Sequence, residues 1–176
     1  MNASRYGRVA IALHWTSALL IAAGAGLGLT MVGLPFTPDK LRWYAWHKWI
    51  GITVFLVALA RLAWRWRVPP PPGAATTPRW QARAARIVHA LLYALMLAVP
   101  LSGWLYSSST GVSVSYLGVV PLPNLVPKDK ALASALLRLH QSLNALLAAA
   151  VALHVAAALK HRFVDRDGVL SRMLPR

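Results

Sequence analysis

The sequence contains no cysteine and no glutamate, and its only acidic residues are four aspartates. Without thiols the chain can form no disulfide, thiolate zinc site, iron–sulfur cluster or cysteine-attached haem. Charged residues of both signs make up only 13% of the chain, well below what the surface of a soluble domain needs. Histidine, with six copies, is therefore the obvious strong metal ligand in a chain poorly suited to water.

The sequence is rich instead in apolar residues, at 57%, and in positive charge, with a formal net charge of +15. A basic protein that binds nucleic acid carries its charge as a stripe or patch on a polar element. Here the lysines and arginines form short clusters between long uncharged runs, which is the pattern of membrane insertion. We therefore expect a lipid bilayer as a partner and no nucleic acid.

Four apolar segments reach the roughly 20 residues that a helix needs to cross the hydrocarbon core. They cover about residues 9–32, 43–66, 87–107 and 132–159. A run of prolines, 69–72, ends the second segment, and a longer loop rich in Gly, Ser, Val and Pro separates the third from the fourth. No internal repeat is visible. The sequence predicts one all-α domain over residues 1–176, an integral membrane four-helix bundle with up-down-up-down topology.

The distribution of lysine and arginine predicts the orientation of this bundle. Thirteen of the nineteen fall on the side that holds both termini, which the positive-inside rule assigns to the cytoplasm. We therefore expect a multi-pass membrane protein with both termini cytoplasmic. The six on the outer side are Lys40, Arg42, Lys48, Lys128, Lys130 and Arg138.

Four histidines fall at matched depths within the predicted spans, where ionisable groups are rare and usually mark function. His14 and His154 lie near the inner ends of the first and fourth spans, and His47 and His140 lie near the outer ends of the second and fourth. The two histidines of the fourth span are fourteen residues apart, which is about 21 Å and close to four whole turns. Both side chains therefore leave the same helix face, one in each leaflet.

Two imidazoles at each level suit the axial positions of haem b held in a bundle core. Zinc or copper would require three or four ligands at one level. A single membrane histidine often does no more than hydrogen-bond a neighbouring helix, but matched pairs favour ligation. The sequence predicts two haem b groups, an inner one bound by His14 and His154 and an outer one bound by His47 and His140.

Other residues near these levels have two interpretations each. His89, just inside the inner end of the third span, can contact a haem propionate or a quinone, or simply pack. Arg61 and Arg65, one turn apart, can pair propionates or extend to the inner interface. His161 falls at the membrane edge and is expected to be interfacial. Five glycines can make room for a porphyrin or allow close helix packing: Gly24, Gly26, Gly28, Gly51 and Gly103.

Several motifs occur in a specific order along the chain. They are RYGRVAIALHW at the start, WHKWIG around His47, VHALLYALMLAVPLSGW around His89, and LHQSLNALLAAAVALHV followed by the tail DGVLSRMLP. In this order they resemble the bacterial cytochrome b561 family of small dihaem b membrane cytochromes over nearly the whole chain. The resemblance implies the same two histidine pairs as iron ligands, and electron transfer between a donor and the quinone pool.

The resemblance also implies a specific activity, because compact members are associated with oxidising superoxide and reducing ubiquinone. We therefore expect an oxidoreductase of the superoxide oxidase type, with Lys48 and Arg138 helping to attract the superoxide anion to the outer haem. The same basic residues can instead anchor lipid headgroups. One alternative function is a cytochrome b membrane subunit that passes electrons between quinone and a larger dehydrogenase or hydrogenase partner. A second alternative is a structural protein without redox function.

Overall fold

The computed structural model describes residues 5–72 and 78–175, and its four long helices coincide with the four predicted spans. All four are long and apolar enough to cross a membrane. The predicted all-α class with four membrane helices is confirmed, whereas the cytoplasmic location of the termini stays a prediction. The helices are α1 (Arg8–Gly33), α2 (Pro38–Arg67), α3 (Arg79–Thr110) and α4 (Lys130–Lys160).

The helices extend past the apolar segments because local capping, not hydropathy, sets their ends. Helix α2 begins at Pro38, where proline suits the first helical position, and the Thr37 hydroxyl accepts the Lys40 amide at 3.4 Å. The Asp129 carboxylate caps α4 by accepting the Leu132 amide at 2.8 Å. Helix α3 ends at Thr110, and the next residue, Gly111, has the positive φ of a left-handed cap.

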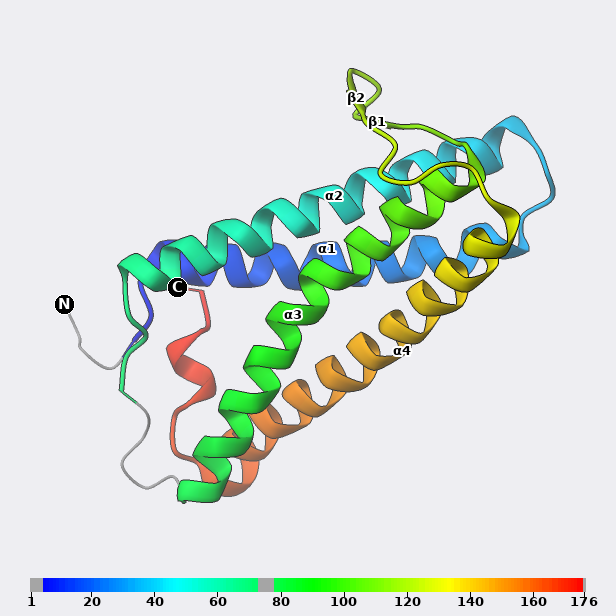
Figure 1. The fold of residues 1–176 in the computed structure, drawn as a ribbon. Coiled ribbons are helices and arrows are strands. Elements are labelled where there is room, and N and C mark those ends of the chain that lie inside the picture. Colours follow the sequence, from blue (N-terminus) through cyan, green and yellow to red (C-terminus); the bar gives the residue numbers. More distant parts are fainter. Residues whose placement is uncertain (1–4, 73–77, 176) are drawn as a thin grey trace.

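Successive helices run in opposite directions along the bundle (Figure 1). Helix α1 packs on α2, α3 packs on α4, and α2 joins the two pairs by packing on α3. The pairs lie close together at the end that holds the α1–α2 and α3–α4 connections and diverge towards the opposite end (Figure 1). We call these the outer end and the inner end, following the predicted orientation.

The buried core is small and lies both within the α3–α4 pair and between the two pairs. One cluster joins Leu95 and Val99 of α3 to Leu147 of α4. Another packs Val54 and Ala58 of α2 against α3. Many large apolar side chains on the outside of the helices are exposed, and a bilayer would cover them.

The α3–α4 connection contains a β-hairpin that the sequence did not predict. Strands β1 (Val114–Tyr116) and β2 (Val120–Leu122) pair antiparallel, with Ser115 opposite Pro121. The segment was expected to be a loop, because three-residue strands are too short to show alternation. The hairpin stands beside the outer half of α2 (Figure 1).

The C-terminal segment after α4 folds back across the inner end. It comprises a π-helical turn η1 (His161–Asp165) and a 3₁₀ turn η2 (Leu170–Arg172). The Trp15 indole donates to the Met173 carbonyl at 2.8 Å, and the Arg172 guanidinium donates to the Pro72 carbonyl at 2.7 Å. This tail therefore links α4 to α1 and to the α2–α3 connection where the helix pairs diverge.

Candidate functional site

The outer pair, His47 on α2 and His140 on α4, comes together as the sequence analysis expected. Their ring centroids are 6.3 Å apart and the rings are nearly perpendicular, at 88°. Two rings that bind one metal atom from opposite sides through bonds of about 2 Å have centres roughly 6 Å apart. The spacing therefore fits two axial ligands of one iron.

Backbone carbonyls orient both outer rings through Nδ1. His47 Nδ1 lies 3.0 Å from the Gly24 carbonyl of α1, and His140 Nδ1 lies 3.1 Å from the Val99 carbonyl of α3. A carbonyl can only accept, so each Nδ1 carries the proton and each Nε2 keeps a free lone pair for a metal. The Ser102 hydroxyl, 2.9 Å from His140 Nδ1, adds a second partner that the sequence reasoning missed.

Two of the five candidate glycines lie directly against the outer rings. A Cβ added at Gly28 would stand 3.1 Å from His47 Cε1, and one at Gly103 would stand 3.0 Å from His140 Cε1. A Cβ at Gly24 would meet Ile50 at 3.2 Å, whereas none at Gly26 or Gly51 would meet any atom within 4 Å. Gly28 and Gly103 therefore leave space for the rings, and Gly51 leaves open space one turn from His47.

The inner pair, His14 on α1 and His154 on α4, also comes together. Their ring centroids are 6.1 Å apart, at an angle of 59°. His89 of α3 joins them, with its ring 5.3 Å from that of His154. The inner level thus holds three imidazoles and the outer level two. The proximity of His89 depends on how α3 tilts against α4, which the sequence does not reveal.

Arg61 belongs to the inner group. One guanidinium nitrogen lies 3.3 Å from His14 Nδ1, and the guanidinium carbon sits 5.1 Å from the centre of the Tyr93 ring. Arg65, one turn further along α2, is exposed. The structure therefore brings Arg61 to the histidines and leaves Arg65 at the surface.

Lys48 and Arg138, the two residues expected to attract superoxide, differ in their surroundings. Lys48 is partly buried, and its ammonium donates to the Ser107 hydroxyl of α3 at 2.8 Å. Arg138 is exposed on α4. It lies two residues before His140, and residues with that spacing do not share a helix face. Any effect of Arg138 on a substrate at the outer pair must therefore act over a distance.

His161 lies outside both groups. Its Nδ1 donates to the Asp167 carboxylate at 2.6 Å, and Asp165 is 3.4 Å away. The three side chains have the spacing of a metal-binding group, but the Lys160 ammonium contacts both Asp165 oxygens, at 2.7 and 2.6 Å. The cluster therefore holds the tail through charged hydrogen bonds.

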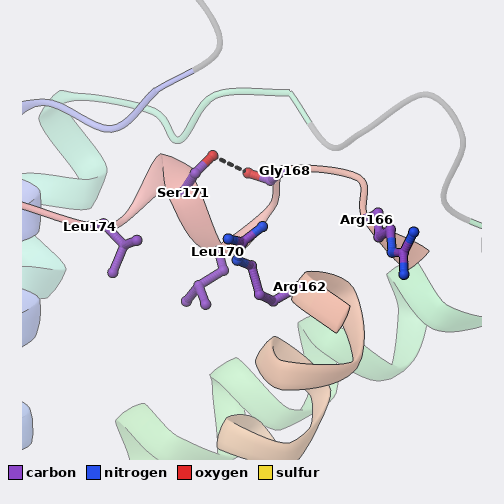
Figure 2. Close-up of a pocket in the computed structure, with 6 residues that line it drawn as sticks. All are labelled: Arg162, Arg166, Gly168, Leu170, Ser171 and Leu174. Atoms are coloured by element: carbon purple, nitrogen blue, oxygen red, sulfur yellow. Dashed lines mark hydrogen bonds between the residues drawn. The ribbon is translucent and has the colours of Figure 1, made fainter. Parts of the chain in front are cut away.

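A pocket of about 270 Å³ opens beside the tail (Figure 2). At one edge of it the Ser171 hydroxyl donates to the Gly168 carbonyl at 2.7 Å (Figure 2). None of the five grouped histidines lines this pocket, so it is separate from the two imidazole groups. Its lining residues are Arg162, Arg166, Gly168, Leu170, Ser171 and Leu174.

Comparison with known proteins agrees with this geometry. Residues 5–176 match the family of prokaryotic cytochrome b561. Cytochrome b561 homolog 2 of Escherichia coli (strain K12) is 35% identical over 175 residues, which cover 97% of this chain and 91% of the relative. Cytochrome b561 homolog 1 of the same strain is 29% identical over 98% of each chain.

A third relative carries a more specific name. The probable superoxide oxidase CybB of Yersinia pestis is 27% identical over 176 residues, covering 98% of this chain and 97% of the relative. Four membrane helices, paired imidazoles at two levels and a match over nearly the full length point to the same conclusion. The chain belongs to the prokaryotic cytochrome b561 family, whose members bind haem b and transfer electrons in membranes.

Proposed function

We propose that this protein is a dihaem b cytochrome of the bacterial inner membrane that transfers electrons from superoxide at the outer face to ubiquinone. The observation that carries the proposal is the pair of imidazole sites built on one helix. His140 and His154 of α4 each face a histidine from another helix, at 6.3 and 6.1 Å between ring centroids. The name of the Yersinia pestis relative supports superoxide as the donor.

The chain's contribution would be to hold and shield two haem groups. Each haem, when bound, would supply one-electron transfer at the edge of its ring. His47 with His140, and His14 with His154, would bind iron through Nε2. Two histidines would hold each haem, so the protein would reserve no ligand position for oxygen, and a substrate would exchange electrons without binding the metal.

The inner group would donate hydrogen bonds to the propionates of a haem or to the carbonyls of a quinone. Arg61 now contacts His14 Nδ1, which can accept only when it carries no proton. Iron on His14 Nε2 would favour a proton on Nδ1, so Arg61 would turn to a different acceptor, such as a propionate. His89 stands beside His154 and would donate to the same propionate or to a quinone carbonyl, and Arg65 is the further propionate candidate.

The outer face would favour an anionic donor. The six outer basic residues outnumber Asp39 and Asp129 on that side, which gives a net charge of about +4 under the predicted orientation. Lys48 would place its ammonium beside the outer pair, and Arg138 would add to the field over a distance.

The test is haem content together with activity in matched histidine variants. His47→Ala or His140→Ala is expected to remove the outer haem, so haem per protein falls from two to one. Superoxide-dependent ubiquinone reduction should fall by more than about tenfold, since even supporting groups of metal sites contribute that much. His161→Ala, which removes a histidine outside both groups, is the control and should keep the outer haem.

Two outcomes would contradict the proposal. Normal haem content in the His47 variant would show that the outer pair does not bind iron. The second outcome is a protein that binds two haems but reduces quinone only with electrons from a co-purified dehydrogenase or hydrogenase, and not from superoxide. That result would favour the membrane-subunit function. Reduced-minus-oxidised spectra and pyridine haemochrome quantitation supply the haem measurements.

A further inference from the structure

The hairpin of residues 114–122 is attached to the side of α2 and not to its end. The Trp49 indole donates to the Ser115 carbonyl at 2.7 Å. The hydroxyls of Thr53 and Tyr116 are 3.0 Å apart. Thr53 already donates its proton to the Trp49 carbonyl at 2.8 Å, so Tyr116 donates to Thr53. Two hydrogen bonds therefore fix the position of the hairpin along α2.

The attachment points on α2 lie within the segment that is predicted to cross the hydrocarbon core. Trp49 and Thr53 follow His47 by two and six residues, which places them about 3 and 9 Å deeper along the helix. Thr53 lies close to the midpoint between His47, at the outer level, and Arg61, which contacts His14 at the inner level. The hairpin folds back from the outer end of the bundle towards its middle (Figure 1). A loop exposed to water would instead extend from the outer end away from the bundle.

The surface of the hairpin is apolar. Residues 111–127 contain no charged side chain. At the tip, Leu117 is 56% exposed, Val119 is 79% exposed and Val120 is 50% exposed. In water such a surface would be unfavourable, whereas among acyl chains it is the expected composition.

Several backbone groups of the hairpin have partners within the protein, because its two strands pair with each other and the Val119 amide donates to the Tyr116 carbonyl at 3.1 Å. Pro121 and Pro123 have no amide proton to satisfy. The Pro123 carbonyl accepts the Trp104 indole at 3.1 Å, as the Ser115 carbonyl accepts that of Trp49. Non-helical backbone persists at membrane depth only where such protein groups satisfy it.

The turn residues indicate the same environment. Leu117 and Gly118 both have positive φ, 53° and 74°, the signature of a type I′ turn. Asparagine or glycine is normal at the first of these positions, and leucine there is conformationally unfavourable. A leucine at this unfavourable position is explained if the turn lies in an apolar environment, where an asparagine side chain would be costly to bury.

From these observations we propose that residues 114–122 form a re-entrant hairpin whose tip, Leu117–Val120, lies among the acyl chains of the outer leaflet. This inference concerns the protein's contact with lipid and does not depend on its haem content or substrate. It replaces the expected loop between α3 and α4 with a membrane-inserted element packed on α2.

The natural absence of cysteine allows a direct test with single-cysteine variants. Leu117→Cys and Val119→Cys report on the tip. Arg42→Cys is the aqueous control, since that side chain is 70% exposed at the outer start of α2. Leu29→Cys is the lipid control, because Leu29 is 82% exposed on α1. Each variant is placed in nanodiscs that hold a single copy and is treated with a water-soluble maleimide.

Both tip variants are expected to react at least about tenfold more slowly than Arg42→Cys, because apolar surroundings suppress the reactive thiolate. Their rates should resemble that of Leu29→Cys, and all four variants should react rapidly after unfolding in detergent. Tip cysteines that react as fast as Arg42→Cys in nanodiscs would overturn the proposal. If protection appears only in discs that hold two copies, a second copy covers the tip, and the lipid assignment is wrong.

Discussion

Each histidine of the outer pair is positioned by atoms of a neighbouring helix. Carbonyls of α1 and α3 hold Nδ1 of His47 and His140, and glycines on the same two helices leave space for the rings. Such supporting contacts fix the tautomer and the direction of a metal-binding histidine. A small change in the support should therefore affect haem binding without removing a ligand.

Gly28→Ala and Gly103→Ala test this support. The added Cβ would lie 3.1 or 3.0 Å from a ring carbon, so the ring must shift by several tenths of an ångström. We expect a selective loss of the outer haem, with affinity lower by about tenfold. Gly26→Ala is the matched control on α1, because its Cβ meets no atom within 4 Å. Haem quantitation measures the effect, and equal loss in the control would contradict it.

At the scale of elements, α4 shows how far the sequence could predict the site. Helical periodicity alone places His140 and His154 on one face and about 21 Å apart. The structure adds contacts between helices, which periodicity does not predict. His89 approaches His154 through the packing of α3, and Ser102 reaches His140 across the α3–α4 contact. Such contacts depend on helix rotation and tilt, which hydropathy does not determine.

The hairpin and the C-terminal tail were not predicted for a related reason. Both are short, without a repeating apolar pattern, and both are held by a few long-range hydrogen bonds. The bonds from Trp15 to Met173 and from Trp49 to Ser115 connect residues far apart in the chain. No local signal in the sequence indicates which carbonyl an indole will reach.

The tail should respond to acid through Asp167. Burial alone would raise the pKa of Asp167, but the Val169 amide and the His161 ring outweigh it and hold this pKa below its usual value. The carboxylate therefore stabilises the folded tail above the pH where an unfolded aspartate titrates, about 3.9, and this stabilisation is lost as the pH falls through the lower folded pKa.

Asp167→Asn should accordingly lower the melting temperature near pH 6, and the gap from the wild type should narrow below about pH 4. Differential scanning calorimetry across this range measures both curves. Asp39→Asn is the control, because its pair with Arg42 is exposed on both sides and contributes little. A gap that widens in acid would show that the sign of the Asp167 contribution is wrong.

At the scale of the whole molecule, the tail compensates for the diverging helix pairs. Helices α2 and α3 make the main contact between the two pairs, and the inner ends separate (Figure 1). The tail crosses that end, with hydrogen bonds from Trp15 of α1 and to Pro72 of the α2–α3 connection. The inner imidazole group thus lies in the part of the bundle that the tail closes, whereas direct helix packing encloses the outer group.

The charge distribution of the whole molecule leads to a prediction about rate. If superoxide reacts at the outer end, removing an outer positive charge should slow the reaction. Two unit charges about 10 Å apart in water interact by about 0.4 kcal/mol, a factor of about 2 in rate. Arg138→Gln should therefore reduce superoxide-dependent quinone reduction about twofold at low salt. The difference should shrink at an ionic strength of about 0.15 M, where the Debye length is about 8 Å.

The matched variant for this experiment is Arg79→Gln at the inner start of α3, which also removes one exposed arginine. It lies at the other end of the bundle, roughly 35 Å along α3 from the outer pair, where two unit charges in water interact by only about 0.1 kcal/mol even without screening. The rate of this variant should therefore stay close to that of the wild type at every salt concentration. Initial rates are measured in nanodiscs, because superoxide can then reach both faces of each variant equally. A twofold loss in Arg79→Gln with none in Arg138→Gln would place the reaction at the inner end and reverse the proposed direction of approach.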